Sequence, residues 1–149
     1  MKRIVLIALL AFLNPAYAQV TVKDAWVRAT APQQQVAAAY LQISSVEDLR
    51  LVAARSPLAG AVEIHETRME NNMTKMRPVA SVALPAGKVV EFTPGGNHIM
   101  LTGLKGPLKE GESVPLTLVV EGRDGKRQSV EVKAMVRPLT AHGGGHHGH

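Results

Sequence analysis

Cysteine is absent from the 149 residues, and this absence excludes several kinds of protein. The chain forms no disulfide bonds, and it lacks the residue that carries the acyl groups of a lipoprotein. A blue-copper electron-transfer site is also excluded, because such a site needs a cysteine ligand. In an oxidising compartment, a cysteine-free protein would hold a soft metal ion with thioether and imidazole groups, which methionine and histidine supply.

Aromatic residues are scarce, at 3% of the chain, and the basic residues are not concentrated in one segment. Single-stranded nucleic acids stack their bases on aromatic side chains, and nucleic-acid-binding surfaces gather Lys and Arg on one face. The formal net charge is +5, and it falls to +3 without Lys2 and Arg3. The composition therefore argues against nucleic-acid binding and indicates a mixed, solvated surface.

Long apolar runs are limited to residues 4–13. This run follows two basic residues and precedes an Asn-Pro break and the sequence Ala-Tyr-Ala at 16–18. A membrane-spanning helix needs about 20 apolar residues, so the run is too short to be an anchor. The layout predicts a cleavable secretory signal over residues 1–18, and so export without stable membrane insertion after cleavage. Up to residue 18, a periplasmic protein and a secreted protein would look the same.

The 131 residues after the predicted signal are enough for one domain with an ordinary core, which we place at 19–138. Short apolar segments with near period-two order alternate with turn sequences such as Pro-Gly-Gly and Asp-Gly. This pattern predicts an all-β sandwich or barrel. The expected strands are 20–30, 36–44, 49–54, 61–67, 74–84, 89–92, 98–104, 115–121 and 129–136.

The composition changes at the C-terminus, where residues 141–149 read AHGGGHHGH. Such a segment contributes nothing to a core, so we expect a flexible His/Gly-rich tail over 139–149. Flexible histidines chelate Cu(II), and also Ni(II) or Zn(II). The candidate tail ligands are His142, His146, His147 and His149.

Two histidines lie outside the tail, and both are close to methionines in the sequence. Alternation along 98–104 puts Ile99 and Leu101 on one face of the strand. His98 and Met100 then share the other face. Because the two apolar side chains should face the core, we expect the His/Met pair at the surface.

The segment 61–67 follows the same alternation. Val62 and Ile64 point one way, and Glu63 and His65 point the other. We therefore expect His65 to share a surface with the pair on 98–104 if the two strands approach each other.

Alternation alone does not place Met76 on the same surface. On one continuous strand, Met76 would lie on the same face as Ala80, Val82 and Leu84, because even numbers of positions separate them. That face would be turned towards the core. A bulge, or a loop that ends before Pro78, would remove this objection.

Two imidazoles and two thioethers form a neutral ligand set that favours Cu(I), since soft sulfur selects this ion. Neutral ligands also suit a metal that is handed on. Zinc sites normally use His with carboxylates, and Glu63 and Glu66 flank His65, so zinc remains a weaker alternative. Met69 and Met73 lie in a polar segment, where a core role is hard to argue, and are candidate auxiliary ligands.

The spacing of His65, Met76, His98 and Met100 is H-x10-M-x21-H-x-M. This signature resembles that of the periplasmic copper(I) chaperone family PCuAC. The resemblance covers roughly residues 22–137 and includes the segments 24–28, 37–40, 62–66, 76–77, 85–87, 94–101, 103–104 and 116–118.

The resemblance implies a cupredoxin-like Greek-key barrel or sandwich that binds one Cu(I) through these four residues. It further implies delivery of copper towards the copper A centre of cytochrome c oxidase, together with a thioredoxin-like assembly protein. The sequence departs from relatives at Thr67 and Thr74, where we expect further methionines.

Two other functions remain open. A copper, nickel or zinc buffering protein without a dedicated acceptor would have the same residues. A structural β-domain would have them by accident. We do not expect an enzyme, because the sequence has no Ser/His/Asp or Cys/His arrangement.

Overall fold

The computed structural model describes residues 18–140, and all of its regular elements are β-strands. The expectations for the signal segment and the His-rich tail therefore fall outside the described residues, apart from their innermost residues. Within 18–140 no helix has the length and hydropathy needed to cross a membrane. The ten strands are β1 (Val20–Arg28), β2 (Val36–Ser45), β3 (Leu49–Arg55), β4 (Ala59–Glu70), β5 (Met73–Pro78), β6 (Val82–Leu84), β7 (Val90–Phe92), β8 (His98–Leu104), β9 (Ser113–Gly122) and β10 (Arg127–Arg137).

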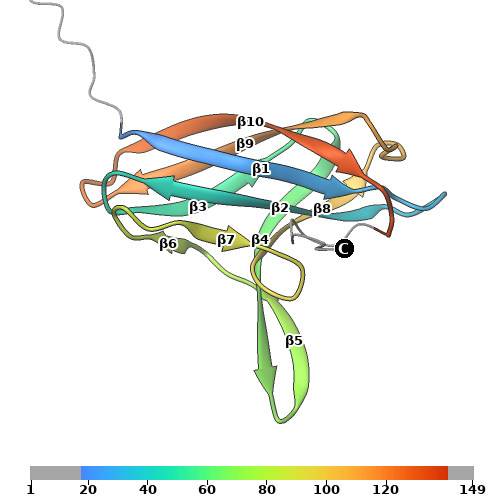
Figure 1. Cartoon of the computed structure of the whole chain (residues 1–149), viewed down its shortest axis with the longest axis horizontal. Helices are drawn as coiled ribbons and strands as arrows, with labels where there is room; N and C mark the ends of the chain where they lie inside the picture. The colour runs from blue at the N-terminus through green and yellow to red at the C-terminus, as the bar shows by residue number, and fades with distance from the viewer. Residues whose placement is uncertain (1–17, 141–149) are drawn as a thin grey trace, which may run out of the picture.

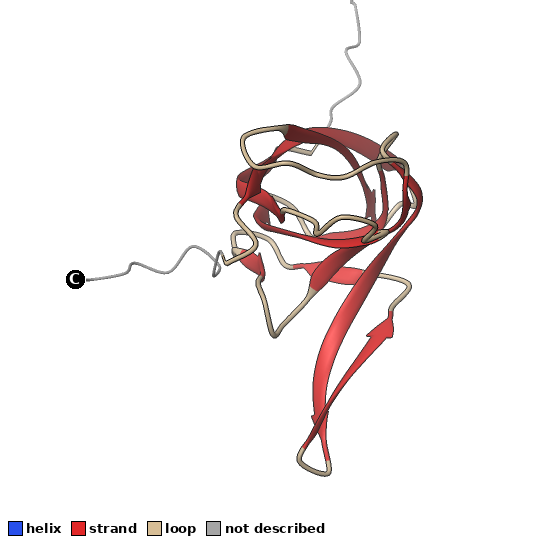
Figure 2. Cartoon of the chain, turned by 90° about the vertical axis from the view of Figure 1, so that its right-hand side faces the viewer, coloured by secondary structure: helices blue, strands red, loops and turns tan. Residues whose placement is uncertain are grey.

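The strands form one sheet in the order β5-β4-β8-β2-β1-β10-β9-β3-β6, and β7 pairs with β2 beside this path. Strands β1 and β10 run parallel, and the other pairs are antiparallel. The sheet curls round on itself into a barrel-like body, which Figure 2 shows end on. The predicted all-β class is confirmed.

The core fills the inside of this curled sheet. Alternate residues of each strand point inward, as Leu116, Leu118 and Val120 of β9 illustrate, and all three are buried. Ile64 of β4 and Ile99 of β8 belong to the same core. Their strand neighbours therefore face outward, which is the arrangement that the sequence predicts for the site.

The predicted strand over 74–84 is wrong in one respect, because it is two strands with different partners. Strand β5 ends at Pro78, which has no N–H to continue a ladder. Val79 donates instead to the carbonyl of Ile64 at 2.9 Å. Strand β6 then pairs with β3, with Leu84 opposite Leu49, on the far edge of the sheet.

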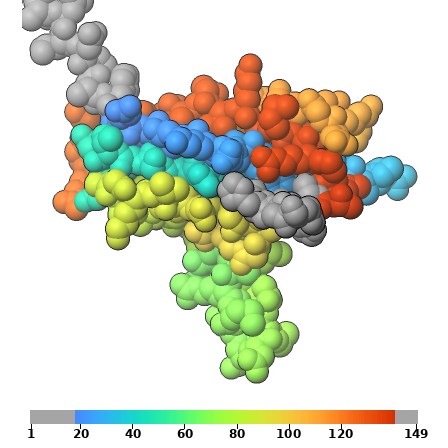
Figure 3. Space-filling model, viewed as in Figure 1, coloured from blue at the N-terminus to red at the C-terminus, as the bar shows by residue number. Residues whose placement is uncertain are grey.

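Strands β4 and β5 form a hairpin that projects from the body (Figures 1 and 3). Its tip holds Asn71 and Asn72, with φ of 50° and 61°, values that asparagine accepts in a two-residue turn. Strand β4 pairs with β8 from Ala59 to His65 and with β5 from His65 to Glu70. His65 is therefore the residue at which the hairpin leaves the barrel.

Candidate metal centre

The two histidines outside the tail lie side by side on adjacent strands. His65 of β4 is the register partner of His98 of β8, and their ring centroids are 5.4 Å apart at 47°. Both rings point away from the core that contains Ile64 and Ile99. The sequence made a shared face of the two histidines depend on the approach of these strands, and the strands do pair at this point.

The expectation that His98 is a surface group is wrong, since it is only 5% exposed. The reason lies on the neighbouring strand β2. Its Ala39 pairs with Ile99, so the next residue, the buried Tyr40, lies on the same outward face beside His98. Sequence alternation gives the direction of a side chain but not what covers it.

Each imidazole makes one hydrogen bond and keeps one ring nitrogen without a partner. His65 Nε2 lies 2.8 Å from Glu63 Oε2, and His98 Nδ1 lies 3.1 Å from the carbonyl oxygen of Gly96. Within residues 18–140, the other two nitrogens, His65 Nδ1 and His98 Nε2, are buried and have no hydrogen-bond partner. Buried polar atoms normally find partners, so this pair fits a site that a metal ion completes.

Met100 and Met76 share the face that holds the histidines. Met100 of β8 lies opposite Glu63 of β4, and Met76 of β5 lies opposite Thr67 of β4. Directly opposed residues point to the same side of a sheet, so both methionines lie on the His65 face. The parity objection to Met76 disappears because β5 ends before Ala80.

The two candidate auxiliary methionines lie on opposite faces of the hairpin. Met69 is the partner of Thr74 and shares the His65 face, and Thr74 Oγ1 donates to Met69 Sδ at 3.2 Å. Met73 is the partner of Glu70 and lies on the opposite face. Both side chains are exposed, at 68% and 62%. Only Met69 can therefore extend the site along the hairpin.

The carboxylates do not form a zinc-type site. Glu66 lies on the opposite face of the hairpin and pairs with Arg68 at 2.8 Å and Arg77 at 2.7 Å. Across residues 18–140, no three His, Asp or Glu side chains gather closely enough to hold a metal ion. Glu63 lies on the His65 face, but its carboxylate is hydrogen-bonded to His65 Nε2. The other donors that we identify on this face are imidazole and thioether, a set that favours Cu(I) over zinc.

Sequence reasoning missed three residues that hold the histidines in place. Glu63 orients His65, and Gly96 orients His98 through its carbonyl. Thr67 Oγ1 donates to the same Gly96 oxygen at 3.0 Å and so ties β4 to the turn before β8. Alternation already places Glu63 on the face of His65, since residues i and i+2 of a strand share a face, and only its hydrogen bond to the ring was missed. The two long-range bonds to Gly96 have no local signal.

An aromatic pair lies beyond His98 on the outward face. Trp26 and Tyr40 have ring centroids 4.7 Å apart, and the guanidinium groups of Arg28 and Arg137 lie 5.8 and 5.0 Å from the Trp26 ring. Burial raises the pKa of Tyr40, and the positive charge of Arg28 acts in the opposite direction. This cluster closes one side of the histidine pair.

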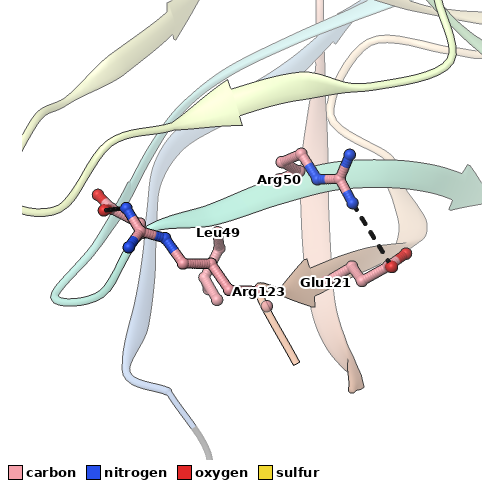
Figure 4. Close-up of a pocket in the computed structure, with 6 residues that line it drawn as sticks. Leu49, Arg50, Glu121 and Arg123 are labelled. Atoms are coloured by element: carbon pink, nitrogen blue, oxygen red, sulfur yellow. Dashed lines mark hydrogen bonds and ion pairs between the residues drawn. The ribbon is translucent and has the colours of Figure 1, made fainter. Parts of the chain in front are cut away.

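A cleft of about 330 Å³ lies elsewhere, near the start of β3 and the end of β9. Figure 4 shows Arg50 reaching Glu121, at 3.5 Å. Arg123 pairs with Asp48 at 2.6 Å at the same cleft. These charges satisfy each other, and the cleft has no His or Met, so it is not part of the metal centre.

Comparison with known families gives a match over nearly the whole described chain. Residues 20–136 match the family described as "Putative lipoprotein LpqE-like". Lxx21020 of Leifsonia xyli subsp. xyli carries the same lipoprotein description and is 35% identical over 100 residues, which are 66% of this chain and 60% of that protein. The present chain has no cysteine to acylate.

Solved structures give the same fold. The copper-bound PCuAC domain from PmoF2 superposes with a TM-score of 0.64 at 22% identity, over 83% of this chain and 99% of that domain. Apo-DR1885 from Deinococcus radiodurans is 31% identical, with a TM-score of 0.57 over 92% and 95% of the two chains. The Cu(I) form of DR1885 matches over 78% of each chain, with a TM-score of 0.53. The fold is therefore cupredoxin-like, as in PCuAC domains.

Proposed function

Because the chain belongs to the PCuAC family, which is the family of the LpqE-like match, we propose that it is an exported Cu(I) carrier. Its ligands are His65, Met76, His98 and Met100. PCuAC domains bind copper, as the copper-bound relatives demonstrate. The family's lipoprotein description supports export, and the signal-like residues 1–18 support the periplasm as the destination.

The observation that carries the proposal is the pair of partnerless nitrogens. His65 Nδ1 and His98 Nε2 are buried on adjacent strands, and two thioethers share their face. Leaving two buried polar atoms without partners costs about 1–3 kcal/mol each in a metal-free protein. A Cu(I) ion that both nitrogens bind would remove this cost.

Exposure differs across the four ligands in a way that suits transfer. His98 is 5% exposed, whereas Met76 on the projecting hairpin is 59% exposed. The imidazole side would anchor the ion, and the thioether side would be accessible to an incoming ligand of an acceptor. Weak, neutral thioether ligands exchange without proton release, so copper can leave by ligand replacement.

The acceptor that we propose is the copper A subunit of cytochrome c oxidase, with a thioredoxin-like protein that keeps its thiols reduced. The support is the family resemblance together with the accessible Met76 edge. We propose a binding protein and not an enzyme, because the four ligands would saturate the ion and leave no open position for a substrate. The tail histidines stay a candidate Cu(II) site outside the described residues.

The first test is competition between residues 19–149 and a chromophoric Cu(I) chelator. The companion variants are a chain that ends at Thr140 and a Met76→Leu/Met100→Leu double variant. One Cu(I) that survives tail removal and is lost in the double variant supports the proposal. Binding that depends on the tail and ignores both methionines refutes it.

A second test separates a carrier from a buffering protein. Cu(I)-loaded protein is mixed with the apo soluble domain of a copper A subunit whose thiols are reduced. Transfer that is faster than from a small Cu(I) complex of equal affinity supports a carrier. Transfer no faster than from that complex, limited by release of free Cu(I), would instead identify a buffer.

A further inference from the structure

The two site histidines are fixed by hydrogen bonds at different ring positions. His65 uses Nε2 towards a carboxylate, and His98 uses Nδ1 towards a backbone carbonyl. Neutral imidazole carries one proton, so a bond that takes the N–H at one nitrogen leaves the lone pair on the other. The hydrogen bonds therefore decide which nitrogen of each ring can bind a metal ion.

We propose that Glu63 is a positioning residue that makes His65 bind copper through Nδ1, whereas the Gly96 carbonyl makes His98 bind through Nε2. This inference rests on the proposed copper site and names the atoms and the supporting groups that act in it. It also assigns a role to Glu63, which is not one of the four ligands.

The assignment for His65 follows from the chemistry of Glu63. An ionised carboxylate only accepts, so the contact of 2.8 Å requires a proton on His65 Nε2. Nδ1 then keeps its lone pair, and it is the buried nitrogen without a partner. Glu63 lies opposite Met100 in the register, so the carboxylate stands on the same face as the ligands.

The assignment for His98 follows from the Gly96 carbonyl, which also only accepts. The bond of 3.1 Å requires a proton on His98 Nδ1 and leaves the lone pair on the buried Nε2. Thr67 donates to the same oxygen at 3.0 Å. The carbonyl is thus held from two sides, and the orientation of the His98 ring depends on a residue of β4.

Glu63 contributes charge as well as orientation. The four ligands are neutral, so bound Cu(I) leaves one positive charge on this face. The Glu63 carboxylate, hydrogen-bonded to a ligand ring, compensates it and makes the imidazole a better donor. Its side chain is 54% exposed, so solvent and salt reduce the purely electrostatic part.

The test uses two-bond ¹H–¹⁵N correlation spectra of ¹⁵N-labelled residues 19–149 at about pH 8, above the ordinary histidine pKa. His65→Gln and His98→Gln spectra identify the two rings among the tail signals. Without metal, we expect the Nε2–H tautomer for His65 and the Nδ1–H tautomer for His98. One equivalent of Cu(I) should then shift His65 Nδ1 and His98 Nε2.

The matched variants change Glu63 while Glu66 of the same strand serves as the control. Glu63→Ala should give a mixture of His65 tautomers and weaken Cu(I) binding about 10- to 100-fold, the usual effect of removing such a support. Glu63→Gln keeps an accepting oxygen and should weaken binding less. Glu66→Gln removes a carboxylate from the opposite face and should leave both the tautomers and the affinity unchanged.

Two results would overturn the inference. One is Cu(I) binding at His65 Nε2, seen as loss of the Nε2 proton with a proton on Nδ1, and the other is an unchanged His65 tautomer in Glu63→Ala. Absence of any shift at either histidine on Cu(I) addition would refute the copper site itself. The metal-free tautomers are measured separately, so failure of the site and failure of the Glu63 role are distinguishable.

Discussion

His65 and His98 face each other across β4 and β8, and each ring presents one buried nitrogen that has no partner within residues 18–140. The relationship joins two parts of the sequence that are 33 positions apart. It also places the pair where the β4–β5 hairpin leaves the barrel, so that one methionine comes from the hairpin and one from the body. Several measurable consequences result from this arrangement.

His98→Leu should stabilise the metal-free protein and abolish Cu(I) binding at the folded site. The substitution replaces a buried, partly unsatisfied imidazole with an apolar side chain, and Thr67 still satisfies the Gly96 carbonyl. We expect the free energy of unfolding to rise by about 1 kcal/mol in urea denaturation. An unchanged or lower stability would argue that the His98 ring is fully satisfied without metal.

Met69→Leu and Met73→Leu form a matched pair, because both residues lie near the tip of the same hairpin and are similarly exposed. Met69 shares the His65 face, and Met73 does not. We expect Met69→Leu to slow Cu(I) transfer or weaken binding by a few-fold, and Met73→Leu to have no effect. Chelator competition and stopped-flow transfer measure both quantities. An effect of Met73 equal to that of Met69 would contradict the face assignment.

Thr67→Val removes the hydroxyl that donates to Gly96 and keeps the shape of the side chain. Loss of this bond should destabilise the protein by about 1 kcal/mol, the usual net value of a hydrogen bond. It should also weaken Cu(I) binding, because the Gly96 carbonyl orients His98. Thr102→Val is the control, because the Thr102 hydroxyl donates to the carbonyl oxygen of Ala61 on β4 and not to that of Gly96. Equal copper affinities in the two variants would show that Thr67 has no role in copper binding.

Tyr40 should titrate above 10.0, because burial beside Trp26 disfavours the phenolate, although Arg28 opposes the shift. A raised pKa in the folded state means that the associated stability is complete below pH 10.0 and is lost as pH rises through the folded-state value. Tyr40 is the one tyrosine of residues 19–149, so tyrosinate absorbance reports it alone. Tyr40→Phe should flatten the alkaline loss of stability, and an ordinary titration of Tyr40 would contradict its burial.

Alternation along the strands predicted much of the fold and part of the site. The faces of His65, His98 and Met100 follow from period two, because Ile64 and Ile99 each occupy the core. The position of Met76 did not follow, since its strand ends at Pro78 and parity beyond that point concerns a different strand. A local sequence pattern cannot show where one strand ends and the next begins to pair with a different strand.

The burial of His98 and the roles of Gly96 and Thr67 could not be predicted for a related reason. Tyr40 belongs to another strand, and the bond from Thr67 to Gly96 spans 29 positions. Such contacts depend on sheet order and register. The spacing of the four His and Met residues resembles a family signature, and such a signature records a tertiary arrangement indirectly.

The most direct test of the central claim is X-ray absorption at the copper edge of the Cu(I)-loaded protein over residues 19–140, in which the tail histidines cannot contribute. We predict an edge typical of Cu(I) and a first coordination sphere that contains both nitrogen and sulfur, whereas the Met76→Leu/Met100→Leu variant should retain no Cu(I) at this site. A sphere of nitrogen and oxygen alone would contradict the His/Met site, whatever affinity the protein showed.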